Sequence, residues 1–474
     1  MKKISKKNNI KMLIALFGIF ILIFSQIGTA HINELVTENE NLRRQLTDII
    51  VPDDYLTIQE AINSAQNGDR VFVRRGTYEE NLDISKIIIL EGEAMDFTII
   101  SGVDDDHVID IKTDGVTIKG FRIENSGTDK AGIYANTCHY HIIKMNIIQS
   151  NSYGIKLYSS NGNIIADNFI ISNAYNGLRV EASHMTNITG NVIHSNGVNG
   201  IFFNFTSTFN SIVSNIIRDN GVVTNKEKLN VKALGTQAGV VMDSASRSNA
   251  IKANNIASNQ QGISNIGASE NNQIFHNDFV DNIDKNAFDS SISIWNSEQA
   301  GNYWSDYTGE DSDGDGIGDI VYLIPGGDNK DRKPLVDPQS PVTPLINGPS
   351  EVEVAKTVSY HIKTLQPVYE EVTYLINWGD SVEWESSEAV NPDEGFTFVH
   401  EWDSEKTFRI RVKAVVKEKG DTRNSEPSSF FPVRVPYKLD KITEESSDEI
   451  ILNDFGNIIR SLLRFHFSKI FSFL

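Results

Sequence analysis

Pairs of asparagines recur through the middle of this chain at a period in the low twenties. The two members of each pair stand five residues apart, and the pairs are Asn146 and Asn151, Asn168 and Asn173, Asn191 and Asn196, Asn215 and Asn220, Asn254 and Asn259, and Asn277 and Asn282. Glycines followed by an apolar residue share this register, at intervals of 22, 23, 23, 39 and 23 residues. A fixed period of this length is typical of stacked supersecondary units, so the fold has to be inferred from the repeat first.

Each repeat consists of short β-rich segments separated by Asn, Ser and Gly. In one repeat these segments are residues 164–165, 169–171 and 178–180, and none is long enough, or has the 3.6-residue period, to form a helix. Three short strands with corners between them predict one coil of a parallel β-helix. The alternative, a leucine-rich solenoid, is disfavoured because the apolar positions carry Ile and Val rather than Leu.

The asparagines have a structural explanation in such a fold. Equivalent residues of neighbouring coils stack about 4.8 Å apart. Asparagine tolerates the left-handed corner conformation, and its amide both donates to and accepts from the corners above and below. We therefore predict a structural ladder made by Asn146, Asn168, Asn191, Asn215, Asn254 and Asn277.

Charge and cysteine content limit the possible partners. The formal net charge of −20 argues against nucleic acid and polyanionic partners and favours a soluble surface that attracts cations. The single cysteine, Cys138, lies among small residues and is predicted to be a buried small hydrophobe, so stability does not depend on disulfides.

The N-terminal fifty residues carry two targeting or assembly features. Residues 1–30 combine lysines with a 13-residue apolar run, which predicts either a cleaved signal peptide or an uncleaved membrane anchor. Residues 31–50 then form a helical stalk, in which a heptad pattern over 32–49 places Asn39 at a core position. Both a self-associating coiled coil and a lone amphipathic helix fit this pattern.

The beginning of the repeat region is predicted to be capped by a helix. Thr57 can cap it, Ile58, Ala61 and Ile62 form its apolar stripe, and Gly68 follows its end. A helix with a polar outer side would cover the unpaired edge of the first coil.

Several segments here resemble the NosD-like proteins with the carbohydrate-binding and sugar-hydrolysis (CASH) repeat. The segments are residues 55–62 (YLTIQEAI), 68–73 (GDRVFV), 76–81 (GTYEEN), 301–307 (GNYWSDY) and 331–335 (DRKPL), where Lys333 replaces the usual aromatic residue. The resemblance covers about residues 52–337 and implies a secreted right-handed parallel β-helix of the pectate-lyase type. NosD proteins are linked to the maturation of a copper site, but one Cys, six Met and no His cluster offer little for copper.

An aspartate-rich loop follows the last repeat. Asp311, Asp313 and Asp315 alternate, Gly316 follows, and Asp319 takes the ninth place, as in loops that bind a hard cation. The carbonyl of Ile317 would be the seventh-position ligand. Since Tyr322 stands where an EF-hand has a bidentate Glu, a missing ligand would come from water, Asp328 or Asp331. We expect a structural Ca²⁺ that clamps the end of the solenoid.

The catalytic residues of this fold class are not recognisable in the chain. The N-T-D and G-H-G signatures of the hydrolases are absent, and the acidic run 104–106 before His107 is best explained as a solvated turn. The remaining histidines of the repeats have no metal-ligand spacing. Catalytic residues therefore stay unknown.

A polar insertion breaks the period between Gly200 and Gly239. Because insertions in solenoids map to loops on one face, often the binding face, Lys226 and Lys228 are predicted ligand contacts. Phe203 and Phe205 lie nearby, and aromatic faces are surfaces on which sugar rings stack. The alternative is that these phenylalanines stack inside the coil.

The chain after the repeats contains a second domain and a distinct tail. Residues 338–344 form a proline-rich linker, and residues 345–436 alternate as antiparallel strands that resemble a PKD domain, an immunoglobulin-like β-sandwich. Residues 437–474 combine an acidic linker with a basic amphipathic helix, in which 451–474 suits contact with a membrane surface.

The sequence thus predicts a mainly β protein with a right-handed parallel β-helix at residues 51–337, followed by a PKD-like sandwich. It would be secreted or at the cell surface, with an N-terminal membrane anchor if the signal is not cleaved. Its expected role is non-catalytic, namely carbohydrate binding, adhesion or structure, towards a polysaccharide or surface glycan. The alternative is a polysaccharide lyase or glycoside hydrolase. The identity of the glycan does not follow from the sequence.

Overall fold

The computed structural model describes residues 48–435, except 104, 223–234, 339–343, 350–351, 365–370, 393, 405, 419–420, 426–427 and 429–430. The predicted signal or anchor, residues 31–47 of the helical stalk predicted at 31–50, and the amphipathic helix at 451–474 lie outside the described residues. The end of the stalk prediction is wrong, because residues 48–50 belong to a strand, β1 (Asp48–Val51), which buries Ile49 and Val51 in the β-helix. No helix in the described part of the chain is long and apolar enough to cross a membrane.

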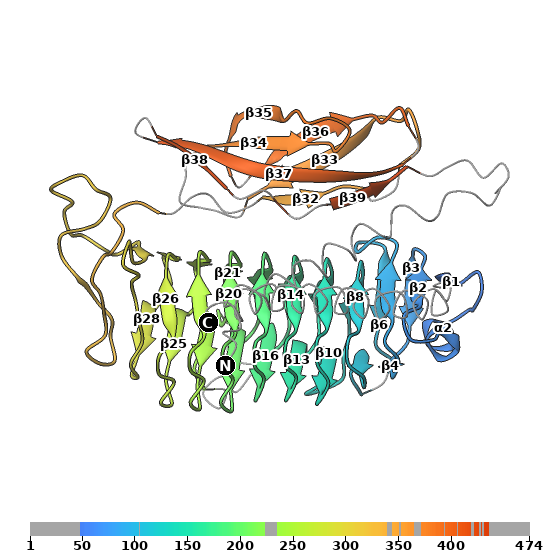
Figure 1. Cartoon of the computed structure of the whole chain (residues 1–474), viewed down its shortest axis with the longest axis horizontal. Coiled ribbons are helices and arrows are strands. Elements are labelled where there is room, and N and C mark those ends of the chain that lie inside the picture. Colours follow the sequence, from blue (N-terminus) through green and yellow to red (C-terminus); the bar gives the residue numbers. More distant parts are fainter. Residues whose placement is uncertain are drawn as a thin grey trace, which may run out of the picture.

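The chain winds in successive coils, and the strands of these coils form the three parallel sheets of the β-helix (Figure 1). Sheet A contains β1 (Asp48–Val51), β2 (Arg70–Val73), β5 (Ile89–Gly92), β8 (Thr117–Lys119), β11 (Ile142–Lys144), β14 (Ile164–Ala166), β17 (Asn187–Thr189), β20 (Ser211–Val213), β23 (Ala250–Lys252) and β26 (Gln273–Phe275). Sheet B contains β3 (Gly76–Glu79), β6 (Thr98–Ser101), β9 (Arg122–Glu124), β12 (Ile147–Gln149), β15 (Phe169–Ile171), β18 (Val192–His194), β21 (Ile216–Arg218), β24 (Asn255–Ala257), β27 (Asp278–Val280) and β29 (Tyr303–Trp304). Sheet C contains β4 (Leu82–Ile84), β7 (Ile109–Ile111), β10 (Ala131–Asn136), β13 (Tyr153–Tyr158), β16 (Leu178–Glu181), β19 (Asn199–Asn204), β22 (Ala238–Met242), β25 (Gln261–Asn265) and β28 (Lys285–Asp289). The predicted fold class is confirmed.

Stacked aliphatic side chains fill the interior. In sheet A the inward row is Val71, Leu90, Ile118, Ile143, Ile165, Ile188, Ile212, Ile251 and Ile274, and every member is fully buried. Because the side-chain period of a strand is 2, three-residue strands such as β11 place one residue inside and two outside. Cys138 is buried and unpaired in the same core, as predicted.

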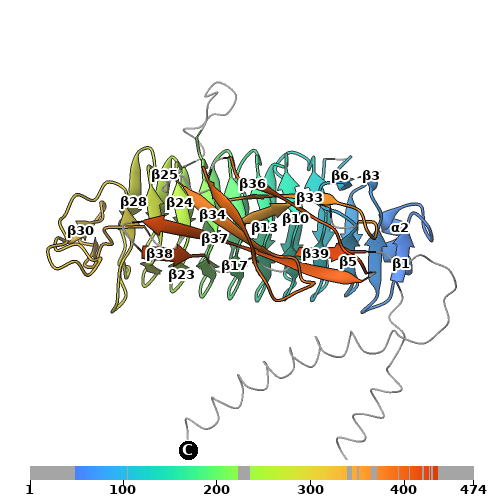
Figure 2. The same cartoon turned by 90° about the horizontal axis from the view of Figure 1, so that it is seen from above.

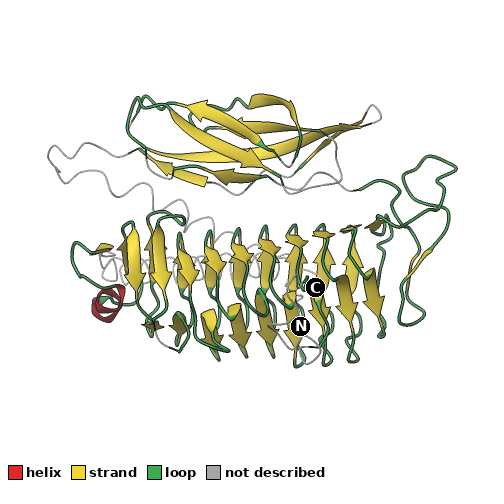
Figure 3. Cartoon of the chain, turned by 180° about the vertical axis from the view of Figure 1, so that it is seen from behind, coloured by secondary structure: helices red, strands yellow, loops and turns green. Residues whose placement is uncertain are grey.

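A helix closes the N-terminal end of this core (Figure 3). Helix α2 (Ile58–Ser64) begins at Thr57, whose hydroxyl accepts the backbone N–H of Glu60, and it buries Ile58, Ala61 and Ile62. The capping helix predicted from the sequence is therefore present.

The ladder residues stand one place after the left-handed corner position, not in it. At the corner between sheets A and B, the positive φ belongs to Met145, Asp167, Gly190, Ser214, Ala253 and His276, each of which precedes a ladder asparagine. The expectation that the asparagines themselves adopt the corner conformation is wrong. Instead their side chains point inward, where each amide bridges neighbouring coils.

Hydrogen bonds between asparagines run in one direction along the β-helix. Asn168 donates both its backbone N–H and its Nδ2–H to Oδ1 of Asn191, each at 3.0 Å, and Asn191 donates in the same way to Asn215. The same pattern links Asn146, Asn168, Asn191, Asn215, Asn254, Asn277 and Asn302. Similar ladders follow the B–C corner from Asn151 and the C–A corner from Asn210.

Each of the three ladders ends on a carboxylate at the C-terminal end of the β-helix. Asn302 donates its backbone N–H to Asp331 at 2.7 Å. The B–C ladder ends through Asn286 on Asp306 at 2.7 Å, and the C–A ladder ends through Asn265 on Asp289 at 2.8 Å. An asparagine in these final positions would present donors without acceptors, whereas a carboxylate only accepts.

Aromatic residues close the core at the same end. Phe279 stacks on Trp304 at 4.4 Å between ring centroids, and Trp304 stacks on Tyr322 at 4.1 Å. The Trp304 indole donates to Asp331 at 3.0 Å. Tyr322 lies in β30 (Tyr322–Leu323), which pairs with β31 (Lys330–Asp331).

A β-sandwich lies along one side of the β-helix (Figure 1), so that it covers the middle of the β-helix when the molecule is seen from above (Figure 2). One sheet contains β32 (Leu345–Asn347), β33 (Val358–Lys363) and β36 (Phe396–His400). The other contains β34 (Val372–Asn377), β35 (Glu385–Val390), β37 (Thr407–Glu418) and β38 (Asp421–Asn424), while β39 (Phe431–Arg434) pairs with β37. Its core surrounds Tyr360, Trp378 and Trp402, and Arg423 bonds the Pro338 carbonyl at 2.7 Å.

Candidate functional site

The aspartate loop brings three carboxylates together. One oxygen from each of Asp311, Asp313 and Asp315 lies within 4.8 Å of the others. The backbone N–H of Gly316, followed by those of Gly314 and Asp315, holds the pKa of Asp311 below its ordinary value. The arrangement can accept a cation with oxygen ligands.

The other predicted ligands of this loop have different positions. Asp319 accepts the Ser312 backbone N–H at 3.0 Å, so it lies in the loop but outside the triad. The backbone N–H of Ile317 donates to Asp315 at 2.8 Å. Asp331 is fully buried and holds the Asn302 and Trp304 donors, which makes the suggestion that it completes the cation site wrong.

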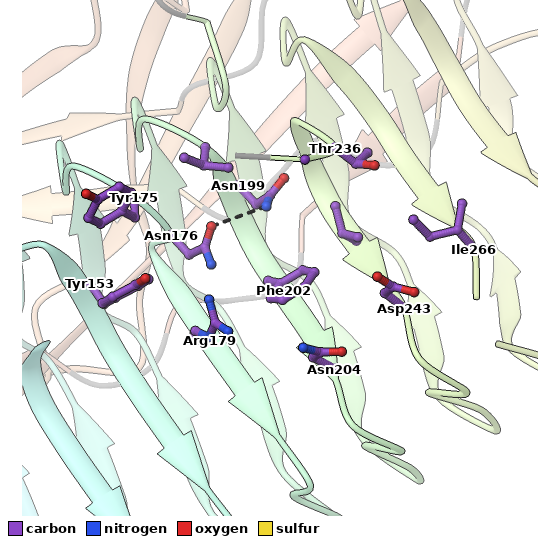
Figure 4. Close-up of a pocket in the computed structure, with 13 residues that line it drawn as sticks. Tyr153, Tyr175, Asn176, Arg179, Asn199, Phe202, Asn204, Thr236, Asp243 and Ile266 are labelled. Atoms are coloured by element: carbon purple, nitrogen blue, oxygen red, sulfur yellow. Dashed lines mark hydrogen bonds between the residues drawn. The ribbon is translucent and has the colours of Figure 1, made fainter. Parts of the chain in front are cut away.

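A second candidate site is a pocket of about 210 Å³ on the outer face of sheet C (Figure 4). Four successive strands, β13, β16, β19 and β22, contribute to it. Its lining residues are Tyr153, Tyr175, Asn176, Arg179, Val198, Asn199, Phe202, Asn204, Gly235, Thr236, Val241, Asp243 and Ile266. We call this the sheet C pocket.

Aromatic rings and a guanidinium form one side of the sheet C pocket. Tyr153 and Tyr175 stack at 5.2 Å between centroids, one coil apart. The guanidinium carbon of Arg179 lies 5.5 Å from the Tyr153 ring centre and 5.3 Å from that of Phe202. Arg179 also pairs with buried Glu181 at 2.6 Å, so its charge is locally balanced.

Two buried polar atoms at this pocket have no hydrogen-bond partner. They are Oδ1 of Asn204, a residue only 9% exposed, and Nε of Arg179. A buried polar group without a partner costs about 1–3 kcal/mol, so such atoms favour a bound hydroxyl, carboxylate or water. The sheet C pocket therefore presents one free acceptor and one free donor beside aromatic faces.

The predicted ligand residues near the insertion are only partly placed. Lys226 and Lys228 lie outside the described residues. Phe203 is 0% exposed and packs in the core, so the prediction that it contacts a ligand is wrong. Phe205 is 52% exposed at the corner after β19, and it does not line the pocket.

Sequence reasoning missed most of the sheet C pocket. Arg179 and Phe202 lie one period apart and are register partners, while Tyr175 lies 22 residues after Tyr153, in the turn before β16. This spacing was the available signal, since equivalent outward positions of successive coils always become neighbours.

Several histidines of the β-helix accept a backbone N–H group from a neighbouring coil, and one of them, His141, does so in a ladder position. Nδ1 of His141 accepts the Val116 backbone N–H at 3.3 Å, and Nδ1 of His139 accepts that of Asn161 at 3.0 Å. His107 and His184 accept the backbone N–H groups of Ala131 and Thr208 in the same way. Burial lowers the pKa of His141 to about 4, so its imidazole is neutral.

The fold defines a class, that of parallel β-helix proteins, and this one has a pocket on the outer face of sheet C. The family within it follows from sequence: residues 62–227 and 225–309 match the model described as "Periplasmic copper-binding protein (NosD)". The chain belongs to the NosD family.

Two curated relatives share part of this region. A protein of Pseudomonas aeruginosa named "Probable ABC transporter binding protein NosD" is 40% identical over 103 residues, which cover 22% of this chain and 23% of the relative. The protein of the same name from Stutzerimonas stutzeri is 33% identical over 177 residues, covering 37% and 39%. The matched part thus spans less than half the length of either relative.

Solved structures are similar at lower identity. Pectate lyase Pel9A is 12% identical with a TM-score of 0.41, over 54% of this chain and 76% of the enzyme. The PKD domain of an M14-like peptidase from a Thermoplasmatales archaeon is 28% identical with a TM-score of 0.18, over 21% of this chain and 98% of that domain.

The described residues do not fit the copper named in the family description. Copper sites in proteins use clustered thiolate, thioether or imidazole ligands. Within the described ranges, the one group of three or more carboxylate, imidazole or thiolate side chains close enough to share an ion is the aspartate triad, which supplies only oxygen. Cys138 is buried, and its thiol donates to the Ile111 carbonyl at 3.1 Å.

Proposed function

We propose that this NosD-family protein is an exported, non-catalytic binding protein that holds a saccharide in the sheet C pocket. The observation that carries the proposal is the unpartnered amide oxygen of Asn204, buried beside Phe202 and Arg179. A sugar hydroxyl can donate to this oxygen while the ring packs against aromatic faces, which is the usual combination in small-ligand pockets. The proposal keeps the carbohydrate-binding role expected from the sequence and gives it a new location.

The described residues of the pocket include too few acidic groups for glycoside hydrolysis, and this favours binding over catalysis. Hydrolysis of a glycosidic bond generally uses two carboxyl groups that flank it. Among the described residues that line the pocket, Asp243 is the only carboxylate, and it accepts the Ser244 backbone N–H at 2.6 Å. Glu181 is held by Arg179. The alternative, a polysaccharide lyase or glycoside hydrolase, would need acidic groups from elsewhere.

A glycan panel assayed with the full chain distinguishes the binding protein from the lyase or hydrolase. We expect retention of at least one oligosaccharide class without any release of reducing ends or unsaturated products over a day. Product formation that disappears in Asp243→Asn would establish the enzyme instead. Absence of binding to every glycan would remove the saccharide proposal.

We also propose that the aspartate triad binds Ca²⁺ in a structural role. Asp311, Asp313 and Asp315 supply hard oxygen ligands, and positive-φ glycines at 314 and 316 permit the tight turn. The loop follows directly after the terminal strand of sheet B, so a bound ion would stiffen the end of the β-helix.

A second candidate function is suggested by the names of the relatives, both "ABC transporter binding protein". On that reading the exported β-helix serves as the soluble partner of a membrane transporter. Cross-linking in the native membrane, followed by identification of the cross-linked chains, tests it. Recovery of transporter subunits would support this role, and it is compatible with saccharide binding.

A further inference from the structure

We infer that the saccharide site selects a glycan carrying an isolated anionic group, a carboxylate or a sulfate, which is held at Lys156 beside the sheet C pocket. This inference rests on the proposed saccharide function and adds the chemical class of the ligand. The argument comes from the row of side chains that faces outward next to the pocket.

The outward row on sheet C carries two neighbouring cations between two aromatic rings. Tyr134, Lys156, Arg179 and Phe202 are successive register partners, one from each coil, and neighbouring coils are about 4.8 Å apart. Nζ of Lys156 lies 5.9 Å from the Tyr134 ring centre and 5.4 Å from that of Tyr153. Tyr153 also lies beside Arg179 and lines the pocket, so Lys156 adjoins the site directly.

Lys156 differs from the other cations of this region in its pairing. Arg179 has Glu181, Lys130 has Asp106 and Lys112 has Asp83 within salt-bridge distance. No carboxylate of the described residues lies within 4.0 Å of Nζ of Lys156. Burial lowers the pKa of Lys156 below its ordinary value, which indicates a partly desolvated ammonium group that an anion would stabilise.

The pocket itself suits one sugar ring. Its volume of about 210 Å³ is below the roughly 300–1,000 Å³ typical of pockets for drug-sized ligands. A ring that donates a hydroxyl to Asn204 would pack beside Phe202, which lies two residues before Asn204 in β19. Arg179, whose Nε has no partner, and then Lys156 follow Phe202 on the next two coils of the same row, so the anionic group would belong to a neighbouring sugar of a chain that extends along this row.

The overall charge of −20 restricts the ligand to a low charge density. Charges more than about 8 Å apart are largely screened at physiological salt, so the local cation decides how an isolated anion binds. A densely charged polymer would be repelled by the acidic surface as a whole. The net charge therefore disfavours nucleic acid and is compatible with a sparsely charged polysaccharide.

The experiment compares matched ligands on the full chain by calorimetry. Uronic-acid oligosaccharides are compared with their carboxyl-reduced forms, and sulfated oligosaccharides with their desulfated forms, which distinguishes the two sources of the anion. We expect an anionic form to bind at least about tenfold more tightly than its neutral partner, and Lys156→Gln to abolish the difference without changing neutral binding. Lys252→Gln is the matched control, because Nζ of Lys252 lies 4.5 Å from the Phe275 ring centre on sheet A.

Each outcome decides the question. Equal affinity for the anionic and neutral forms would overturn this inference and leave the saccharide function intact. An equal loss in Lys156→Gln and Lys252→Gln would show general electrostatics rather than a site, and would also overturn it. If no saccharide of either kind binds, the proposed function itself fails. Melting temperatures of both variants verify that the fold is retained.

Discussion

At the scale of single residues, an asparagine amide does between coils what a backbone peptide does between strands. Asn191 accepts two hydrogen bonds from Asn168 and donates to Asn215 and to the carbonyls of Ile165 and Thr189. Because the interior excludes water, no other partner is available to these groups. The ladder therefore contributes to stability and not to ligand binding.

Replacing Asn191 by Ala should destabilise the β-helix by about 2–4 kcal/mol, since donors of Asn168 lose their acceptor in a dry interior. Chemical denaturation followed by circular dichroism measures the change. Asn187→Ala is the control, because Asn187 is exposed at the start of β17 and its replacement should shift stability by less than about 0.5 kcal/mol. A similar loss in both variants would contradict the ladder as the cause.

Asp331→Asn tests the ladder end. Its two carboxylate oxygens accept the backbone N–H groups of Asn302 and Lys333 and the Trp304 indole N–H. In the variant, the side-chain NH₂ group would face an N–H donor that has lost its acceptor. This should lower the free energy of unfolding by about 1–3 kcal/mol at pH 7. A melting temperature equal to that of the unsubstituted protein would refute the assigned role.

At the scale of elements, the coils differ in the residue that takes the ladder position at each corner. His141 takes a position that asparagine takes in later coils. Its buried ring has a pKa of about 4, below the 6.5 of an exposed histidine. The unfolded chain thus takes up a proton between pH 6.5 and 4 that the folded chain does not. Stability is therefore lost as the pH falls through this window.

Replacement of His141 by Asn should reduce this acid sensitivity. The amide can still accept the Val116 N–H in the ladder position but does not titrate. The difference between the two proteins in free energy of unfolding should change by up to about 3 kcal/mol between pH 7 and pH 4. Parallel pH profiles for the two proteins would show that His141 is not responsible.

Much of this element structure is predictable from sequence, because stacking repeats the same short-range rules in every coil. The coil period, the α2 cap and its Thr57 N-cap, the inward Ile rows and the core Cys138 all follow from pattern alone. Phe203 was misassigned although alternation from buried Ile201 places Phe202 outside and Phe203 inside. The pocket was missed because it depends on register between coils, which single-strand patterns do not contain.

At the scale of the whole molecule, the two ends of the solenoid are its vulnerable points. A repeat array is stabilised by contacts between neighbouring units, so an end unit has only one neighbour. The N-terminal end is covered by α2, and the C-terminal end by stacked aromatic rings and buried carboxylates. The proposed calcium loop follows directly on this second closure.

Calcium should therefore raise the melting temperature, and EDTA should reverse the effect. The double variant Asp313→Asn, Asp315→Asn should lose the response, since it removes two of the three clustered carboxylates. Differential scanning calorimetry with calcium or EDTA measures it, with magnesium as a comparison ion. An unchanged melting temperature on adding EDTA to calcium-loaded protein would count against the assignment.

The direction of the ladders sets how such a protein can lengthen during evolution. A duplicated unit inserted between Asn168 and Asn191 would find an acceptor on one side and a donor on the other, so growth from within preserves every bond. A unit appended beyond Asp331 would meet a carboxylate that has no proton to offer. The same three carboxylates leave the last coil without the side-chain donors that would be needed to continue the ladders onto a second molecule stacked head to tail.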